Sequence, residues 1–162
     1  MSEIKYLRRA VEFGMKYSDD PRTRVGAMIF RNSEYDGSLL GANRLPKGLL
    51  ANAARISREH KGRYVEHAER DVIYGAARNG FKTDGCVMYA PWFACCDCAR
   101  AIIESGIREV VGLMSLHAMT PARWSGDIAA AHQMLEEAGV GMRWITAELG
   151  TTILFDGKEI EV

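Results

Sequence analysis

Two short clusters of metal-binding side chains constrain this chain more than any other feature of its sequence. The first is His67-Ala68-Glu69 and the second is Cys95-Cys96-Asp97-Cys98. Each cluster is followed by apolar residues at helical spacing, so each is predicted to open a helix. Zinc favours imidazole and thiolate ligands, and a single ion bound by both clusters would bring the two helix starts together.

Helix geometry selects among the three crowded cysteines. Residues three apart lie on one face of a helix, whereas adjacent residues point apart, so Cys95 and Cys98 are the predicted pair and Cys96 is a bystander. The free N–H groups at a helix N-terminus favour thiolate and lower a cysteine pKa. With His67 the chain offers three ligands, which leaves a fourth position for water, as in catalytic zinc sites.

Glu69 lies two residues beyond the histidine ligand, close enough to reach a zinc-bound water without being a ligand itself. Zinc lowers the pKa of bound water to about 7, and a positioned carboxylate can then carry protons during hydrolysis. We interpret Glu69 as this proton carrier. A purely structural zinc clip is the alternative, and such a clip would have no need of the carboxylate.

The rest of the chain alternates between helical and extended patterns, which is typical of an α/β sandwich with a partly parallel sheet. Its length is typical of a single domain, here residues 1–162. Helices are expected at 4–17, 67–78, 96–105 and 124–138, and strands at 25–30, 39–42, 87–90, 109–113 and 141–145. Residues 32–37 have turn chemistry, and an Asp-Gly pair within 151–162 predicts a terminal hairpin.

The overall charge of the chain is balanced, and basic residues are in excess only in one stretch. Lys plus Arg and Asp plus Glu number 21 each, which argues against a nucleic-acid partner. The irregular stretch from Asn43 to Tyr64 is read as a long loop with a basic excess. Together with Arg22 and Arg24, this loop could neutralise one phosphate of a free nucleotide.

The N-terminus lacks the apolar core of a signal peptide, and no stretch has the length of a membrane span. Three of the four cysteines are crowded together, which in a reducing compartment indicates metal binding and not a disulfide framework. We therefore expect a cytoplasmic protein without a membrane partner.

The two clusters together resemble the zinc-dependent cytidine/deoxycytidylate deaminase family, whose signature is His-x-Glu followed by Pro-Cys-x-x-Cys. The likeness extends to residues 20–27, 41–43, 66–69 and 98–107. It implies a three-layer α-β-α cytidine-deaminase-like fold with a mixed, partly parallel sheet of about five strands, a Zn²⁺ cofactor and a homo-oligomer. Residues 92–100 look most similar to deoxycytidylate deaminases, which implies hydrolysis of dCMP to dUMP with release of ammonia.

The same resemblance implies where a nucleotide substrate would bind. Asn43 matches the position that contacts the sugar, and the backbone around Ala68 would read the pyrimidine edge. Arg24 belongs to the group expected near the phosphate, and Tyr64 or Trp92 could stack on the base.

Two residues depart from the family pattern, and several functions stay open. Ala94 stands where the family has a proline before the first cysteine, and Asp71 stands where an asparagine is usual. A nucleoside, guanine or tRNA adenosine deaminase on the same fold is an alternative within the class. A non-catalytic zinc module that binds a nucleotide is an alternative outside it.

Overall fold

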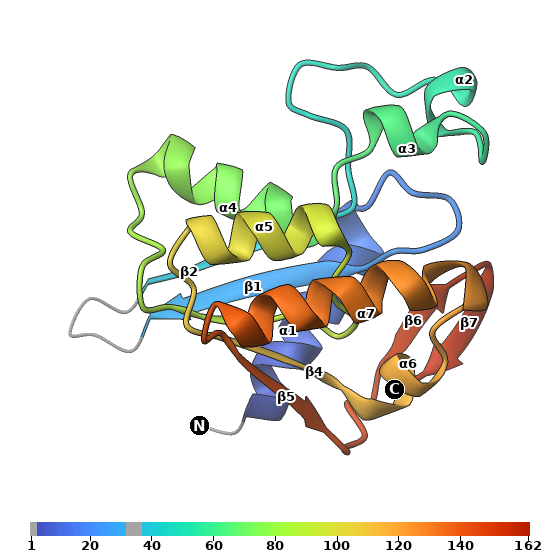
Figure 1. Cartoon of the computed structure of the whole chain (residues 1–162). Helices are drawn as coiled ribbons and strands as arrows, with labels where there is room; N and C mark the ends of the chain where they lie inside the picture. The colour runs from blue at the N-terminus through green and yellow to red at the C-terminus, as the bar shows by residue number, and fades with distance from the viewer. Residues whose placement is uncertain (1–2, 32–36) are drawn as a thin grey trace.

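A five-stranded mixed sheet forms the middle layer of the computed structural model, which describes residues 3–31 and 37–162 (Figure 1). The strand order is β2-β1-β3-β4-β5. The first strand pairs antiparallel with β2 and β3, whereas β3, β4 and β5 are mutually parallel. The bounds are β1 Gly26–Arg31, β2 Gly37–Ala42, β3 Val87–Tyr89, β4 Glu109–Leu113 and β5 Gly141–Ile145.

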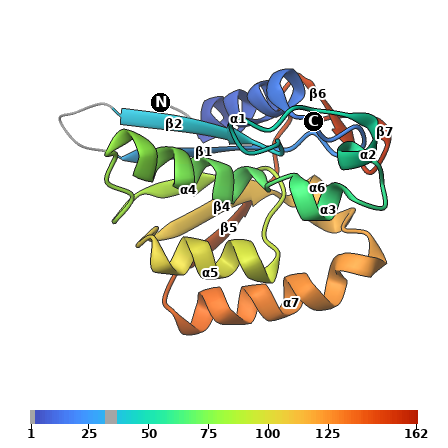
Figure 2. The ribbon, with the colours of Figure 1, turned by 90° about the horizontal axis from the view of Figure 1, so that it is seen from above.

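Helices cover both faces of this sheet, so the predicted three-layer α-β-α fold is confirmed. The helix α1, Glu3–Tyr17, packs on one face. On the other face α4, Ala68–Asn79, lies beside α5, Cys96–Glu104, which in turn lies beside α7, Ala122–Glu137 (Figure 2). The predicted positions of these helices and strands agree with the structure to within a few residues. The predicted turn at 32–37 lies almost entirely outside the described residues.

The start of α4 is held very close to β2. An added Cβ at Gly41 would lie 2.6 Å from both the Ala68 carbonyl oxygen and the Val72 backbone nitrogen. A glycine at this position therefore allows the helix to pack directly on the strand. At its far end α4 stops at Gly80, which has a left-handed φ of 67°.

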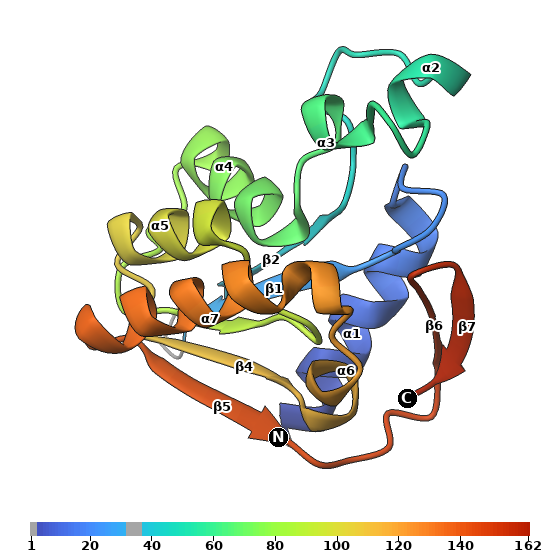
Figure 3. The ribbon, with the colours of Figure 1, turned by 45° about the vertical axis from the view of Figure 1, so that its right-hand side comes forward.

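The segment from Asn43 to Tyr64 is not only loop. It contains two one-turn helices, α2 at Ala53–Ile56 and α3 at Lys61–Tyr64, which stand above the edge of the sheet (Figure 3). A third short helix, α6 at Met114–Ala118, directly follows β4 and was also not predicted. Elements of four or five residues are too short to show a helical period, so periodicity could not predict them.

The predicted terminal hairpin is confirmed as β6, Thr152–Phe155, and β7, Lys158–Glu161. It lies beside α1 (Figure 3) and is tied to the segment that precedes β1. The Arg24 N–H donates to the Leu154 carbonyl at 2.8 Å, and the Gly157 N–H donates to the Arg22 carbonyl at 2.7 Å. Among the described residues, no helix is long and apolar enough to cross a membrane.

Candidate metal centre and pocket

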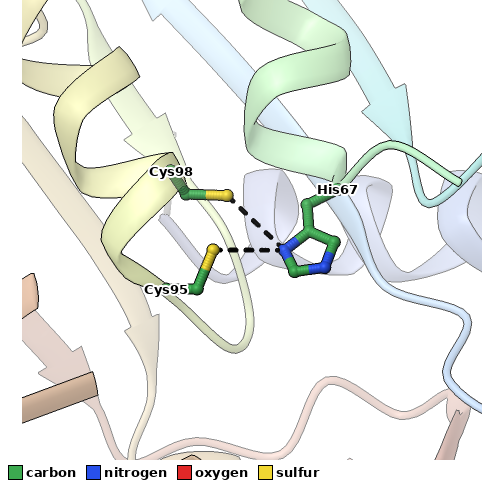
Figure 4. Close-up of side chains that lie close together, drawn as sticks. All are labelled: His67, Cys95 and Cys98. Carbon is green, nitrogen blue, oxygen red and sulfur yellow. Dashed lines mark hydrogen bonds between the residues drawn. The ribbon is translucent and has the colours of Figure 1, made fainter. Parts of the chain in front are cut away.

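The two predicted clusters meet at the adjacent N-termini of α4 and α5. His67 is the N-cap of α4, Cys95 is the N-cap of α5, and Cys98 follows one turn later. The His67 Nδ1 atom lies 3.4 Å from the Cys95 Sγ and 3.6 Å from the Cys98 Sγ (Figure 4). All three ligand atoms lie within 4.8 Å of one another.

These separations fit a tetrahedral zinc ion. Zinc–sulfur bonds of about 2.3 Å and zinc–nitrogen bonds of about 2.0 Å place sulfur and nitrogen ligands about 3.5 Å apart at the tetrahedral angle. Within residues 3–31 and 37–162, this is the one cluster of three or more His, Cys, Asp or Glu side chains arranged to hold a metal. The Cys96 thiol instead donates to the Asp127 carbonyl at 3.3 Å, which places it outside the trio.

The surroundings of the two cysteine ligands favour thiolate at Cys95 and disfavour it at Cys98. A hydrogen bond from the Cys98 thiol and another with His67 lower the pKa of Cys95 to about 4, against the opposing effect of burial. The same bond to Cys95, together with burial, raises the pKa of Cys98. Arg70 places its Nη1 atom 3.9 Å from the Cys95 Sγ and forms an ion pair with Glu66. Arg70 thus brings a positive charge next to the anionic ligand set.

Glu69 lies in the first turn of α4 and is only 4% exposed. Burial raises the pKa of its carboxyl group above the ordinary value, because a charged carboxylate is disfavoured away from water. Its side chain lines the same pocket as His67 and Cys95. A buried carboxyl group with a raised pKa is suited to taking up a proton and giving it back.

Asn43 connects the end of β2 to the start of α4. Its Oδ1 accepts the Ala68 N–H at 2.9 Å, and its Nδ2 donates to the Thr23 carbonyl at 3.0 Å. The side chain also lines the pocket. Ala68 itself is fully buried, and its N–H is already used by Asn43, so the structure does not place it in the pocket wall.

The two departures from the family pattern are accommodated in different ways. The Asp71 carboxylate accepts the Ala42 N–H at 3.0 Å and forms an ion pair with Arg44 at 2.8 Å. Both carboxylate contacts tie the first turn of α4 to the end of β2 and the segment just after it. Ala94 is buried next to Phe93, whose ring stacks on Trp144 with centroids 5.4 Å apart. This stacking anchors the segment that leads into α5.

Two of the three metal ligands, His67 and Cys95, border a cavity of about 400 Å³, a volume typical of small-molecule sites. Aromatic side chains from three parts of the chain form much of its wall. The Trp92 ring meets Trp124 and Phe155 edge-on, with centroids 6.1 and 5.0 Å away, and its Nε1 donates to Thr120 at 3.0 Å. Cations surround the more exposed part of the cavity: Arg22, Arg58, Lys61 and Arg123.

Not every predicted substrate contact reaches this cavity. Asn43 and Trp92 line it, but Arg24 and Tyr64 do not. The Arg24 guanidinium donates to the Met15 carbonyl at 3.3 Å, at the end of α1, and Tyr64 is 40% exposed beneath the Arg55 guanidinium. Tertiary contacts draw these two side chains elsewhere in this structure, and their roles in substrate binding stay predictions.

Several pocket residues were missed by sequence reasoning. Arg123 and Trp124 come from the first turn of α7, and Phe155 and Asp156 come from the terminal hairpin. The Asp-Gly turn predicted the hairpin itself, but no local pattern indicated that it would dock beside the metal centre.

Comparisons with known proteins agree with this geometry. A sequence model described as the cytidine and deoxycytidylate deaminase zinc-binding region matches residues 1–114. Human deoxycytidylate deaminase is 31% identical over 145 residues, which cover 86% of this chain and 77% of the relative. An uncharacterized deaminase of Aliivibrio fischeri is 31% identical over 133 residues, covering 82% and 86%.

A solved structure shows the same fold. The dCMP deaminase from the cyanophage S-TIM5, crystallised in complex with dCMP and dUMP, superposes with a TM-score of 0.71 at 24% identity. The match covers 90% of this chain and 98% of the phage chain.

Proposed function

Because the chain belongs to the cytidine and deoxycytidylate deaminase family, we propose that it hydrolyses dCMP to dUMP with release of ammonia. The observation that carries this proposal is the composition of the cavity. One group of lining residues is His67, Cys95 and the buried Glu69, and another group consists of the cationic side chains Arg22, Arg58, Lys61 and Arg123. A cytosine base suits the first group and a phosphate suits the second.

His67, Cys95 and Cys98 would hold the zinc ion. When bound in such a site, zinc supplies a Lewis acid that makes water a competent nucleophile near neutral pH. Glu69 would accept the proton of this water on its carboxylate and deliver it to the ring nitrogen of the base. The same carboxylate would then take the remaining proton of the oxygen that has added to the ring carbon and give it to the exocyclic amine, which departs as ammonia and leaves a carbonyl group. Burial of Glu69 supports this role because it brings the carboxyl pKa closer to the working pH.

The protein side chains would also orient the base. Trp92 is fixed by its hydrogen bond to Thr120 and packs edge-on against Phe155, so it offers a rigid apolar wall. Asn43 would hold the start of α4, and with it His67 and Glu69, at a constant distance from this wall. Its remaining N–H could reach the sugar, as the family resemblance implies.

Ammonia release from a panel of aminated bases, nucleosides and nucleotides tests the proposal. We expect turnover of dCMP at a clearly higher kcat/KM than turnover of deoxycytidine, because only dCMP carries the phosphate. Glu69→Gln should retain stoichiometric zinc and lose about 10²–10⁴-fold in kcat. Equal kcat/KM for dCMP and deoxycytidine would refute the assignment of the cationic side chains to the phosphate. A higher kcat/KM for guanine, or for adenosine in tRNA, than for dCMP would refute dCMP as the substrate.

We further propose a single-domain, homo-oligomeric enzyme of the cytoplasm. The four cysteines are all free, which suits a reducing compartment. Size-exclusion chromatography with light scattering would measure the oligomeric state, and a monomeric mass at micromolar concentration would refute that part.

A further inference from the structure

A single carboxylate lies among three arginines at the exposed part of the cavity. Asp156 binds Arg123 through both carboxylate oxygens, at 2.5 and 3.2 Å. Its backbone carbonyl accepts from Arg22 Nη2 at 3.1 Å, and its carboxylate lies 3.9 Å from the same nitrogen. Hydrogen bonds from Arg123, with the charges of Arg22 and Arg58, lower the pKa of Asp156, so it is ionised at neutral pH.

The backbone fixes this carboxylate in place. Asp156 and Gly157 form the tip of the hairpin with positive φ angles of 48° and 82°. The Asp156 N–H donates to the Thr23 hydroxyl at 3.3 Å, and Gly157 is bonded to the Arg22 carbonyl. A side chain at 157 would meet the Arg22 guanidinium at 2.9 Å. The hairpin tip therefore stays against the segment before β1 and presents Asp156 to the cavity.

The charges around the cavity nearly match those of one phosphate. Three arginines against one aspartate leave two positive charges, because Lys61 is already paired with the buried Asp20 at 2.5 Å. Glu59 also borders the cavity with a side chain that is 84% exposed, so its charge is screened by water and the net positive charge lies between one and two. A phosphate monoester carries a charge of about −1.5 to −2 at neutral pH. A diphosphate or triphosphate would exceed the available positive charge.

We propose that Asp156 is a specificity-determining residue that restricts the cavity to nucleoside monophosphates. This inference rests on the proposed deamination of a cytosine nucleotide. Additional phosphate groups would have to lie near a fixed carboxylate, and their repulsion grows with the charge of the ligand. The family model ends at residue 114, so Arg123 and Asp156 lie in a part of the chain beyond its match.

Asp156→Asn tests this role because asparagine also tolerates a positive φ and removes only the charge. We would measure kcat/KM for dCMP, dCDP, dCTP and deoxycytidine, and the dissociation constants of dCMP and dCTP by calorimetry. The preference for dCMP over dCTP should fall about tenfold in Asp156→Asn, with a smaller effect at high salt.

Two further variants keep the result interpretable. Asp156→Glu retains the charge and should retain most of the preference. Asp84→Asn is the matched control, since Asp84 is an exposed partner of Lys82 outside the cavity. An unchanged preference in Asp156→Asn with normal zinc content and thermal stability would overturn the inference. Failure of the wild-type protein to deaminate dCMP would instead refute the proposed function. The ratio of the dissociation constants of dCMP and dCTP, measured by calorimetry, would still test the role of Asp156.

Discussion

Replacing Asn43 by alanine should destabilise the fold and disturb the metal centre together. The asparagine side chain is 8% exposed and makes two hydrogen bonds, one to the Ala68 N–H and one to the Thr23 carbonyl. Alanine leaves the fully buried Ala68 N–H without its side-chain partner, which costs about 1–3 kcal/mol, and loses a second bond worth about 0.5–1.5 kcal/mol. We therefore expect the free energy of unfolding to fall by about 1.5–4.5 kcal/mol.

Urea unfolding of the zinc-loaded protein, followed by circular dichroism, measures this change. Asn43→Asp keeps an acceptor for the Ala68 N–H but loses the donor to Thr23, so its loss should be smaller than that of Asn43→Ala. Asn79→Ala is the control, because the Asn79 side chain is exposed at the end of α4 and donates a hydrogen bond to the Gly75 carbonyl of the same helix. If Asn43→Ala unfolded within about 0.5 kcal/mol of the wild type, the structural role of Asn43 would be refuted.

Two further substitutions test the packing and the charge around the centre. Gly41→Ala should lower the free energy of unfolding by about 1–3 kcal/mol, because its Cβ would press on the backbone of α4, and calorimetric melting would show this. Gly75→Ala, in open space on the same helix, should be neutral or raise stability by about 1 kcal/mol, and equal effects at the two glycines would contradict the argument. Arg70→Ala should weaken zinc binding about 10–100-fold in competition with a chelator, since it removes the cation beside Cys95. Unchanged affinity would show that this cation does not influence the metal.

The sequence was most informative where function depends on local geometry. His67, Cys95 and Cys98 could be assigned because ligand spacing on a helix is a local property, and the structure brings their three ligand atoms together. The Asp-Gly turn predicted the terminal hairpin for the same reason, because a two-residue turn requires particular φ angles.

The substrate-facing wall could not be predicted in this way. Arg22 and Arg24 are close in sequence, yet only Arg22 borders the cavity, because Arg24 is drawn to the end of α1. Arg123 and Phe155 reach the cavity through the docking of α7 and of the hairpin. These contacts depend on tertiary packing between segments that are distant in sequence. Hydrophobic periodicity predicts helices and strands but not which of them pack together.

The position of the metal trio has a consequence for how the molecule holds together. His67 belongs to the helix that follows the antiparallel strands, whereas Cys95 belongs to the helix between two parallel strands. A zinc ion joining them therefore acts as a reversible cross-link between the two halves of the domain and closes a loop of 28 residues. By the chain-entropy relation used for disulfides, closing such a loop stabilises the folded state by about 3–4 kcal/mol. A bound zinc ion would thus also supply the cross-link that the free cysteines do not form.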